Sequence, residues 1–379
     1  MALVGAVTVL TGSLLPVIVN DLTLRPAQAG LLVSASAIGY ILAATLAGAL
    51  GDSWGYHRVW LAGIATGFLA LIGVSLAPSF GWLLPAIAAL GLVGGFCDAS
   101  LGALLGRMFQ GRSGSALNQV FLFVGVGATI TPFAIGLALQ QGVPWRWQYA
   151  AVAVLALITG LLVSTVRVEH SGNASPRGQR SPSVRKLLAS PVILASVLTM
   201  LLYTGAEGSI FSWVAYYLTV ARDLAAAIAS MGVAVFWVGI VAGRIVCGRL
   251  IERIGYRPII VGGGMAGALG IALLLLLPGQ LLPWAGILLA GLAFGGIYPT
   301  ILATAMQPQA TPREHAGAVT GIICTGGGIG KIAMPWLVGE TIEGVSLPLG
   351  IGLVIGMSLL MAIVYLRGTQ SHKAQSAAR

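Results

Sequence analysis

Twelve apolar runs account for most of this chain and constrain its fold more than any other feature. Each run is about 20 residues long, the length that an α-helix needs to cross about 30 Å of hydrocarbon. Charged residues make up 8% of the sequence, whereas soluble domains carry about 25%. The sequence therefore predicts an all-α, polytopic membrane protein with twelve transmembrane helices, near residues 2–19, 28–50, 59–77, 83–106, 116–139, 147–166, 191–218, 225–247, 258–277, 281–306, 316–339 and 347–366.

The chain also repeats itself at an offset of 200 positions, because residues 48–58, GALGDSWGYHR, match residues 248–257, GRLIERIGYR. The glycines at 5, 39, 91 and 95 recur at 205, 239, 291 and 295. Two similar halves in an apolar chain are the ground plan of an alternating-access carrier. We expect two pseudo-symmetric six-helix bundles, residues 1–168 and 188–379, joined by a polar cytoplasmic linker at 169–187. The repeat would start the first helix upstream of Met1, so either this helix is short or the natural start lies further upstream.

The basic residues fall mostly on one side of the predicted membrane. Three of them, Arg25, Arg146 and Arg222, lie on one side, and sixteen lie on the side of the C-terminal tail. Positively charged loops stay in the cytoplasm, so both termini are expected there, in a protein of the plasma membrane (the bacterial inner membrane). The net charge of +10 then reflects topology and contact with the lipid bilayer, and no nucleic-acid partner is expected. The cytoplasmic set is Arg58, Arg107, Arg112, Arg167, Arg177, Arg180, Arg185, Lys186, Arg244, Arg249, Arg253, Arg257, Arg313, Arg367, Lys373 and Arg379.

No pattern of catalytic residues is found in the sequence. The four histidines lie in predicted loops or the tail without metal-ligand spacing, and the three cysteines lie far apart in apolar helices. No phosphate-binding GxxxxGK[ST] loop is present. We therefore predict a protein that is not an enzyme, needs no metal or cofactor, and draws its energy from an ion or substrate gradient.

Several segments resemble the major facilitator superfamily along the full chain. They are the GxxxDxxG loop at 48–55 with its echo at 248–255, and the segments GGFCDASLG (94–102), ALNQVFLFVGVGA (116–128), YTGAEGSIFSWVAYYL (203–218), GLAFGGIYPTILA (291–303) and GGGIGKIAMPWLVG (326–339). Within the superfamily they are most similar to the fucose/glucose/galactose permease group. Ser53 departs from the family pattern, which usually has a basic residue there. The resemblance implies the major facilitator fold and conformational-switch loops formed by Gly48, Asp52, Gly55, Arg58, Gly248, Glu252, Arg253, Gly255 and Arg257.

Asp98 is the first candidate for a functional side chain. A carboxylate near the middle of the membrane is costly and usually serves transport, and burial favours its protonated form. The resemblance implies proton coupling at this position of the fourth helix, facing Tyr298 across a central cavity. A structural hydrogen bond and direct substrate contact remain alternatives. Gly102 stands where the relatives often have a sugar-binding Asn, which weakens the sugar assignment.

Two further charged residues lie inside predicted helices, Glu207 in the seventh and Lys331 in the eleventh. Buried opposite charges are tolerated mainly when they are paired, so we expect a Glu207–Lys331 ion pair. Two alternatives remain: Lys331 binds an anionic substrate, or it neutralises Asp98. Glu207 matches the family pattern and is a second candidate for proton coupling, whereas Lys331 departs from the small or apolar residue usual there.

The remaining candidates for the substrate cavity are polar and aromatic residues. Asn118 matches part of an LNxxH pattern of the relatives, but Phe121 replaces its His. Aromatic rings suit the C–H faces of sugars, although packing is the more usual role for any one of Trp213, Tyr216, Trp237 and Tyr298. The tryptophans expected to act as interfacial anchors are Trp82, Trp145, Trp147 and Trp284.

These features predict a secondary active transporter that acts as a monomer on a small-molecule substrate, with proton-coupled uptake of a polar solute such as a sugar. Two alternatives use the same residues: a proton-driven exporter of drugs or metabolites, and an organic-anion carrier. A non-transporting sensor with this fold would have lost its intramembrane charges, which this chain retains. The sequence leaves open whether the coupling ion is a proton or sodium and whether transport is symport or antiport.

Overall fold

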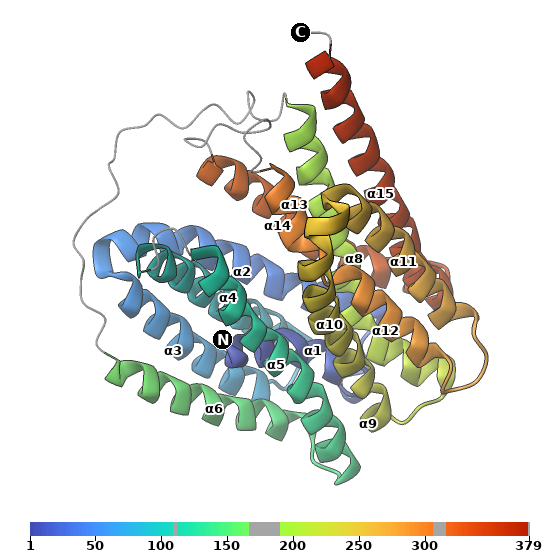
Figure 1. Ribbon diagram of the computed structural model, residues 1–379. Helices are drawn as coiled ribbons and strands as arrows, with labels where there is room; N and C mark the ends of the chain where they lie inside the picture. The colour runs from blue at the N-terminus through green and yellow to red at the C-terminus, as the bar shows by residue number, and fades with distance from the viewer. Residues whose placement is uncertain (109–112, 167–189, 306–315, 378–379) are drawn as a thin grey trace. The chain divides into compact units, whose positions relative to one another are not determined.

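The computed structural model describes residues 1–108, 113–166, 190–305 and 316–377, and in these residues all regular secondary structure is helical (Figure 1). Twelve spans in the described chain are long and apolar enough to cross a membrane, as predicted. Two of them are interrupted, so α9 and α10 form one span, and α12 and α13 form another. The helices are α1 (Ala2–Asp21), α2 (Pro26–Trp54), α3 (Tyr56–Ser75), α4 (Phe80–Met108), α5 (Ser113–Gln140), α6 (Trp145–Thr165), α8 (Pro191–Arg222), α9 (Ala226–Ala229), α10 (Met231–Ile254), α11 (Tyr256–Leu276), α12 (Pro283–Phe294), α13 (Ile297–Ala305), α14 (Ala316–Gly344) and α15 (Leu347–Ala377).

The chain divides into two compact units. The first unit comprises Met1–Arg177 and Ser212–Ala234, and the second comprises Gly178–Phe211 and Val235–Arg379. The proposed linker at 169–187 lies outside the described residues, and the bundle boundaries at 168 and 188 remain a prediction.

Each unit is held together by helices that pack closely in pairs. In the first unit α2 packs on α4, α3 packs on α4 and α6, and α1 packs on α5. Leu10, Leu14 and Ile18 recur every fourth residue along α1 and are fully buried, which gives this helix one continuous apolar face. In the second unit α11 packs on α12 and α15, and α14 packs on α15.

The repeat seen in the sequence is also present in the backbone. Thr23 and Asp223 are the two non-glycine residues with positive φ in the described chain, at 48° and 52°, and they are 200 positions apart. Gly55 and Gly255, also 200 positions apart, have φ of 86° and 77° where α2 meets α3 and where α10 meets α11. A positive φ favours glycine, which explains why both halves of the chain have glycine at this position.

The closest helix contacts repeat at the same offset. A Cβ atom on Gly39, Gly91 or Gly95 would collide with a backbone carbonyl oxygen across the α2–α4 contact, and Gly239, Gly291 and Gly295 stand in the same relation across the α10–α12 contact. Small residues let two helix backbones approach in a membrane. These glycines therefore allow the close packing of α2 against α4 and of α10 against α12. The contacted oxygens belong to Ala88, Ser36 and Tyr40 in the first unit and to Leu288, Phe236 and Ile240 in the second.

The tenth predicted helix is broken at Gly295 and Gly296, between α12 and α13. Pro299 lacks the amide hydrogen that would bond the carbonyl of Gly295 four residues earlier. The next carbonyl oxygen, that of Gly296, accepts from the hydroxyl of Thr300 at 2.6 Å and from its backbone amide at 3.4 Å. The break places irregular backbone two residues before Tyr298, one of the predicted cavity residues.

Candidate functional site

Asp98 lies on α4 and accepts a hydrogen bond from the hydroxyl of Tyr40 on α2, with 3.0 Å between Oη and Oδ2. Gly94 stands one turn before Asp98, and a Cβ atom there would lie 3.0 Å from the ring of Tyr40. The missing side chain of Gly94 therefore makes room for the ring that brings the hydroxyl to the carboxyl group. Asp98 is half-buried in this arrangement.

The Tyr40–Asp98 bond joins the same two helices that pack through Gly39, Gly91 and Gly95. A carboxyl group between two helices changes the hydrogen bonding between them when it gains or loses a proton. The ionised form can only accept hydrogen bonds, whereas the protonated form can also donate one. The geometry thus suits both the structural and the proton-coupling interpretations of Asp98. Tyr40 was not found from the sequence, since nothing in its spacing marks it.

Glu207 lies at the centre of α8 and is only 7% exposed. Its Oε1 accepts a hydrogen bond of 2.8 Å from the hydroxyl of Tyr203, one turn earlier on the same helix. The ring of Tyr203 is fully buried and packs against Phe294 and Tyr298 at centroid distances of 5.9 and 6.4 Å. These contacts fix the tyrosine, so its hydroxyl is held toward the carboxyl group.

Lys331 lies at the middle of α14 but does not pair with Glu207; within the described chain Glu207 takes Tyr203 as its partner. The expected Glu207–Lys331 ion pair is therefore absent from this structure. Lys331 meets α8 at Gly208, where a Cβ atom would lie 4.0 Å from its Cγ. Neighbouring residues on a helix point about 100° apart, so Glu207 and Gly208 project in different directions from α8.

Arg244 lies deeper in the membrane span than its assignment to a cytoplasmic loop predicted. It was counted among the cytoplasmic loop residues, but it lies inside α10, ten residues before the end of the span at Ile254. Its charge interacts electrostatically with Tyr203, the donor to Glu207. The Nε atom of Arg244 is buried and has no hydrogen-bond acceptor among the described residues. The signal available in the sequence was its position within the predicted helix at 225–247.

The other cavity candidates are scattered. Trp213 is fully buried and packs edge-on against Tyr216 at 5.5 Å in the first unit. Trp237 is 5% exposed and packs on Phe211 at 6.0 Å in the second unit. The side chain of Asn118 lies outside the described part of the structure, although its backbone belongs to α5.

Tyr298 is half-buried on α13, and its hydroxyl lies 3.7 Å from Sγ of Cys324 on α14. It therefore sits beside Tyr203 and close to the break in the tenth helix. Its predicted position opposite Asp98 concerns two different units and stays a prediction.

The predicted switch loops lie at the ends of α2 and α10. Gly55 and Gly255 end these helices with positive φ, and Arg58 is exposed at the start of α3. The side chains of Gly48 and Asp52 are outside the described set. In the second loop the described side chains of Glu252, Arg253 and Arg257 are exposed, and Gly248 lies on α10 with open space around it. Their switching role stays a prediction.

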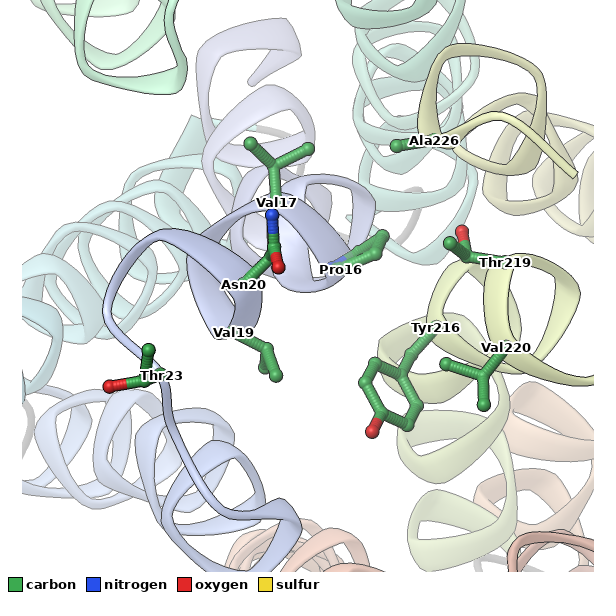
Figure 2. Close-up of a pocket in the computed structure, with 9 residues that line it drawn as sticks. All are labelled: Pro16, Val17, Val19, Asn20, Thr23, Tyr216, Thr219, Val220 and Ala226. Atoms are coloured by element: carbon green, nitrogen blue, oxygen red, sulfur yellow. The ribbon is translucent and has the colours of Figure 1, made fainter. Parts of the chain in front are cut away.

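A pocket of about 460 Å³ lies in the first unit between the C-terminal ends of α1 and α8. Figure 2 shows Tyr216, Thr219 and Val220 of α8 across the pocket from Pro16 and Val19 of α1. Its volume is within the range of small-molecule pockets, about 300–1,000 Å³. Tyr216 is the one predicted cavity residue among those lining it, and the other lining residues are Val17, Asn20, Thr23 and Ala226.

Trp145 differs from the expected interfacial anchor. It is 2% exposed, and its Nε1 donates to Oδ2 of Asp21 at 3.0 Å. The same oxygen accepts from Arg146 at 2.6 Å, and the guanidinium of Arg146 lies 4.3 Å from the ring of Trp145. Trp145 is therefore a structural residue that joins the start of α6 to the end of α1, whereas Trp82 and Trp147 are exposed, as an anchor requires.

Comparison with known proteins identifies the family. The model of the Major Facilitator Superfamily matches residues 1–335. An uncharacterised MFS-type transporter of Yersinia pestis is 26% identical over 344 residues, which cover 89% of this chain and 86% of that protein. A chloramphenicol resistance protein of Streptomyces lividans is 26% identical over 370 residues, which cover 95% and 93%. The crystal structure of a D-xylose–proton symporter has a TM-score of 0.78 at 14% identity, covering 96% of this chain and 94% of that one. The chain therefore belongs to the Major Facilitator Superfamily and is a multi-pass membrane transporter, not an enzyme.

Proposed function

We propose that this transporter couples the uptake of a small polar solute to the movement of protons. The observation that carries the proposal is Asp98, a half-buried carboxyl group on a membrane-spanning helix that accepts a hydrogen bond from Tyr40. Ionisable side chains inside a membrane protein mark ion pathways and proton relays. The similarity of several segments to the fucose permease group supports a sugar or a related polyol as the solute class.

The energetics favour a proton as the coupling ion at Asp98. An ionised Asp at the centre of a membrane helix costs about 2.5–3.5 kcal/mol on insertion scales. Binding one proton removes the charge, and the Tyr40 hydroxyl, which can donate or accept, stays bonded in both states. Asp98 therefore takes up a proton when it is open to one side of the membrane and releases it when it is open to the other. Glu207 and its donor Tyr203 form a second such pair.

Proton movement during transport tests this function. Purified protein in liposomes that hold a pH-sensitive dye is offered a panel of sugars, polyols, organic acids and dyes, each tracked by its own uptake. The expected result is that one solute class enters together with protons, and that a protonophore abolishes its accumulation. Transport without any proton movement, or transport that requires sodium, would contradict the proposal.

A proton-driven exporter is the second candidate, favoured by the similarity to the Streptomyces lividans chloramphenicol resistance protein along 95% of this chain. The same carboxyl groups serve antiport, in which protons and solute move in opposite directions. The sign of the dye signal separates the two functions, because export predicts proton movement against the direction of the solute. An independent measurement is the growth, in the presence of chloramphenicol, of cells that express this protein.

We further propose that the protein is a monomer in the bacterial inner membrane with both termini in the cytoplasm. The charge asymmetry of the loops supports this orientation, with Arg25, Arg146 and Arg222 on the outer side. The placement of Arg244 inside α10 removes one residue from the cytoplasmic set without changing the direction of the asymmetry. The two six-helix halves would then alternate in exposing the solute to each side.

A further inference from the structure

The pocket of about 460 Å³ between the C-terminal ends of α1 and α8 has a lining that is polar but uncharged. We call it the outer pocket, because the loop charges predict that these helix ends face the outside. The lining found in the described chain includes no Asp, Glu, Lys, Arg or His, so a charged solute would find no opposite charge there. Its polar side chains are Asn20, Thr23, Tyr216 and Thr219, and its apolar ones are Pro16, Val17, Val19, Val220 and Ala226 (Figure 2).

Two of these polar side chains have hydrogen-bonding groups to offer a solute. The amide of Asn20 and the hydroxyl of Tyr216 make no hydrogen bond to other residues of the described chain. An amide has two donors and one acceptor, which suits neighbouring hydroxyl groups on one solute. The ring of Tyr216 packs edge-on against the buried Trp213 at 5.5 Å, so its position is fixed before a solute binds.

The backbone at Thr23 is a second, independent observation at this pocket. Thr23 lines the pocket with a φ of 48°, which is unusual for a β-branched residue. Its counterpart in the repeat, Asp223, has a φ of 52°, but Asp is common at positive φ. Strained backbone of this kind clusters at ligand-binding sites, and Thr adds a hydroxyl group to the lining.

A neighbouring pocket of about 320 Å³ shares Val17 and Asn20 with the outer pocket. Its lining does contain charges, those of Asp21 and Arg146. These two side chains pair with each other, with 2.6 Å between Oδ2 and the guanidinium nitrogen. The charges closest along the chain to Asn20 are therefore compensated within the protein, which again favours a neutral solute.

We propose that the outer pocket is a binding site for the transported solute and that this solute is a neutral polyol such as a monosaccharide. Asn20 and Tyr216 bond to its hydroxyl groups, and the apolar residues of α1 cover one of its C–H faces. The inference rests on the proposed transport function. It adds the residues that hold the solute on the outer side, and it predicts that an organic anion is not the substrate.

Protection of a single cysteine from labelling tests whether a solute occupies the pocket. Thr219→Cys is made in a chain without the three native cysteines, purified in detergent and treated with a maleimide. The probes are D-glucose, D-galactose and D-mannose, each with its uronate, which differs by one carboxylate. At least one hexose should slow the labelling in a concentration-dependent way, while its uronate should not. Ala221→Cys, an exposed position on α8 outside the pocket lining, is the control and should label at an unchanged rate.

Two variants locate the groups that bind the solute. Asn20 is exposed, so Asn20→Ala should fold normally, and its apparent affinity for the protecting hexose should fall about two- to tenfold, as for one lost neutral hydrogen bond. Thr23→Gly should lower the affinity similarly without lowering the melting temperature, because glycine adopts positive φ readily. Gln141→Ala, at an exposed residue outside the outer pocket, is the control and should bind like the wild type.

Four results would overturn the proposal: no protection by any hexose, equal protection by a hexose and its uronate, hexose affinity that Asn20→Ala and Thr23→Gly both leave unchanged, or protection by chloramphenicol but by no hexose. Failure of the proposed function looks different, because the hexose then still protects Thr219→Cys although its uptake into liposomes moves no protons. If the pocket alone is wrong, a solute enters liposomes together with protons while Thr219→Cys labels at an unchanged rate.

Discussion

Replacing Tyr203 by Phe removes one oxygen atom and tests how firmly Glu207 is held. The ring of Tyr203 keeps its edge-on contact with Phe294 and leaves no large cavity. What is lost is the 2.8 Å hydrogen bond to Glu207, a group that is 7% exposed and therefore gains little from water. The substitution isolates the contribution of that hydrogen bond to the stability of the second unit.

The expected loss depends on the charge of the acceptor. A hydrogen bond to a charged group contributes about 1.5–3 kcal/mol, and one between neutral groups contributes about 0.5–1.5 kcal/mol. Tyr203→Phe should therefore lower the free energy of unfolding by about 1.5–3 kcal/mol when Glu207 carries its negative charge. In a Glu207→Gln background the same change should cost about 0.5–1.5 kcal/mol.

The chain supplies a matched control in Tyr149→Phe. Tyr149 is also fully buried, but its hydroxyl lies 3.0 Å from the neutral hydroxyl of Thr11, so its loss should cost about 0.5–1.5 kcal/mol. Reversible unfolding of purified protein in mixed micelles, titrated with a denaturing detergent, measures all variants. Equal losses for Tyr203→Phe in the wild type and in Glu207→Gln would show that the hydroxyl and the carboxyl group are not coupled, and the account of Glu207 would be wrong.

Three further predictions follow from the packing, the backbone and the topology. Gly91→Ala should destabilise the protein by about 1–3 kcal/mol because the added methyl group collides with the carbonyl of α2, whereas Gly81→Ala, which has open space around it, should leave the melting temperature unchanged; equal effects would refute the close contact. Gly255→Ala should cost about 1–3 kcal/mol because the residue has φ 77° and ψ −179°, a region nearly restricted to glycine, and an unchanged melting temperature would contradict this backbone geometry. In a background without the three native cysteines, Ser181→Cys should label only from the cytoplasm and Gln280→Cys only from outside; labelling of Ser181→Cys in intact cells would reject the orientation.

The fold was predictable from the sequence because its main determinants are local or periodic. Each membrane span is a continuous apolar run, so all twelve were found in sequence. The repeat predicted equivalent roles for glycines 200 positions apart, and the structure places Gly91 and Gly291 at equivalent helix contacts. The break between α12 and α13 was not predicted, because the apolar run at 281–306 is continuous in the sequence and does not reveal the hydrogen bond that Pro299 cannot donate.

The site was less predictable because side-chain partners depend on the direction of each residue around its helix. Glu207 and Lys331 were expected to pair because they lie at similar depths along their helices. In the structure Lys331 lies next to Gly208, the residue after Glu207, and Glu207 accepts a hydrogen bond from Tyr203. Tyr40 was missed because its partner Asp98 is 58 residues away. Arg244 was missed because a count of charges by loop ignores how far a helix extends.

The central claim is that Asp98 carries the coupled proton, and solute transport by Asp98→Asn tests it most directly. Asn has nearly the same shape but does not ionise, so the variant should lose solute accumulation driven by a proton gradient while it still exchanges solute across liposomes at equal pH. Asp223→Asn is the matched control, because Asp223 is an exposed turn residue with φ 52° that Asn tolerates, and it should accumulate solute like the wild type. Undiminished proton-driven accumulation by Asp98→Asn would contradict the account.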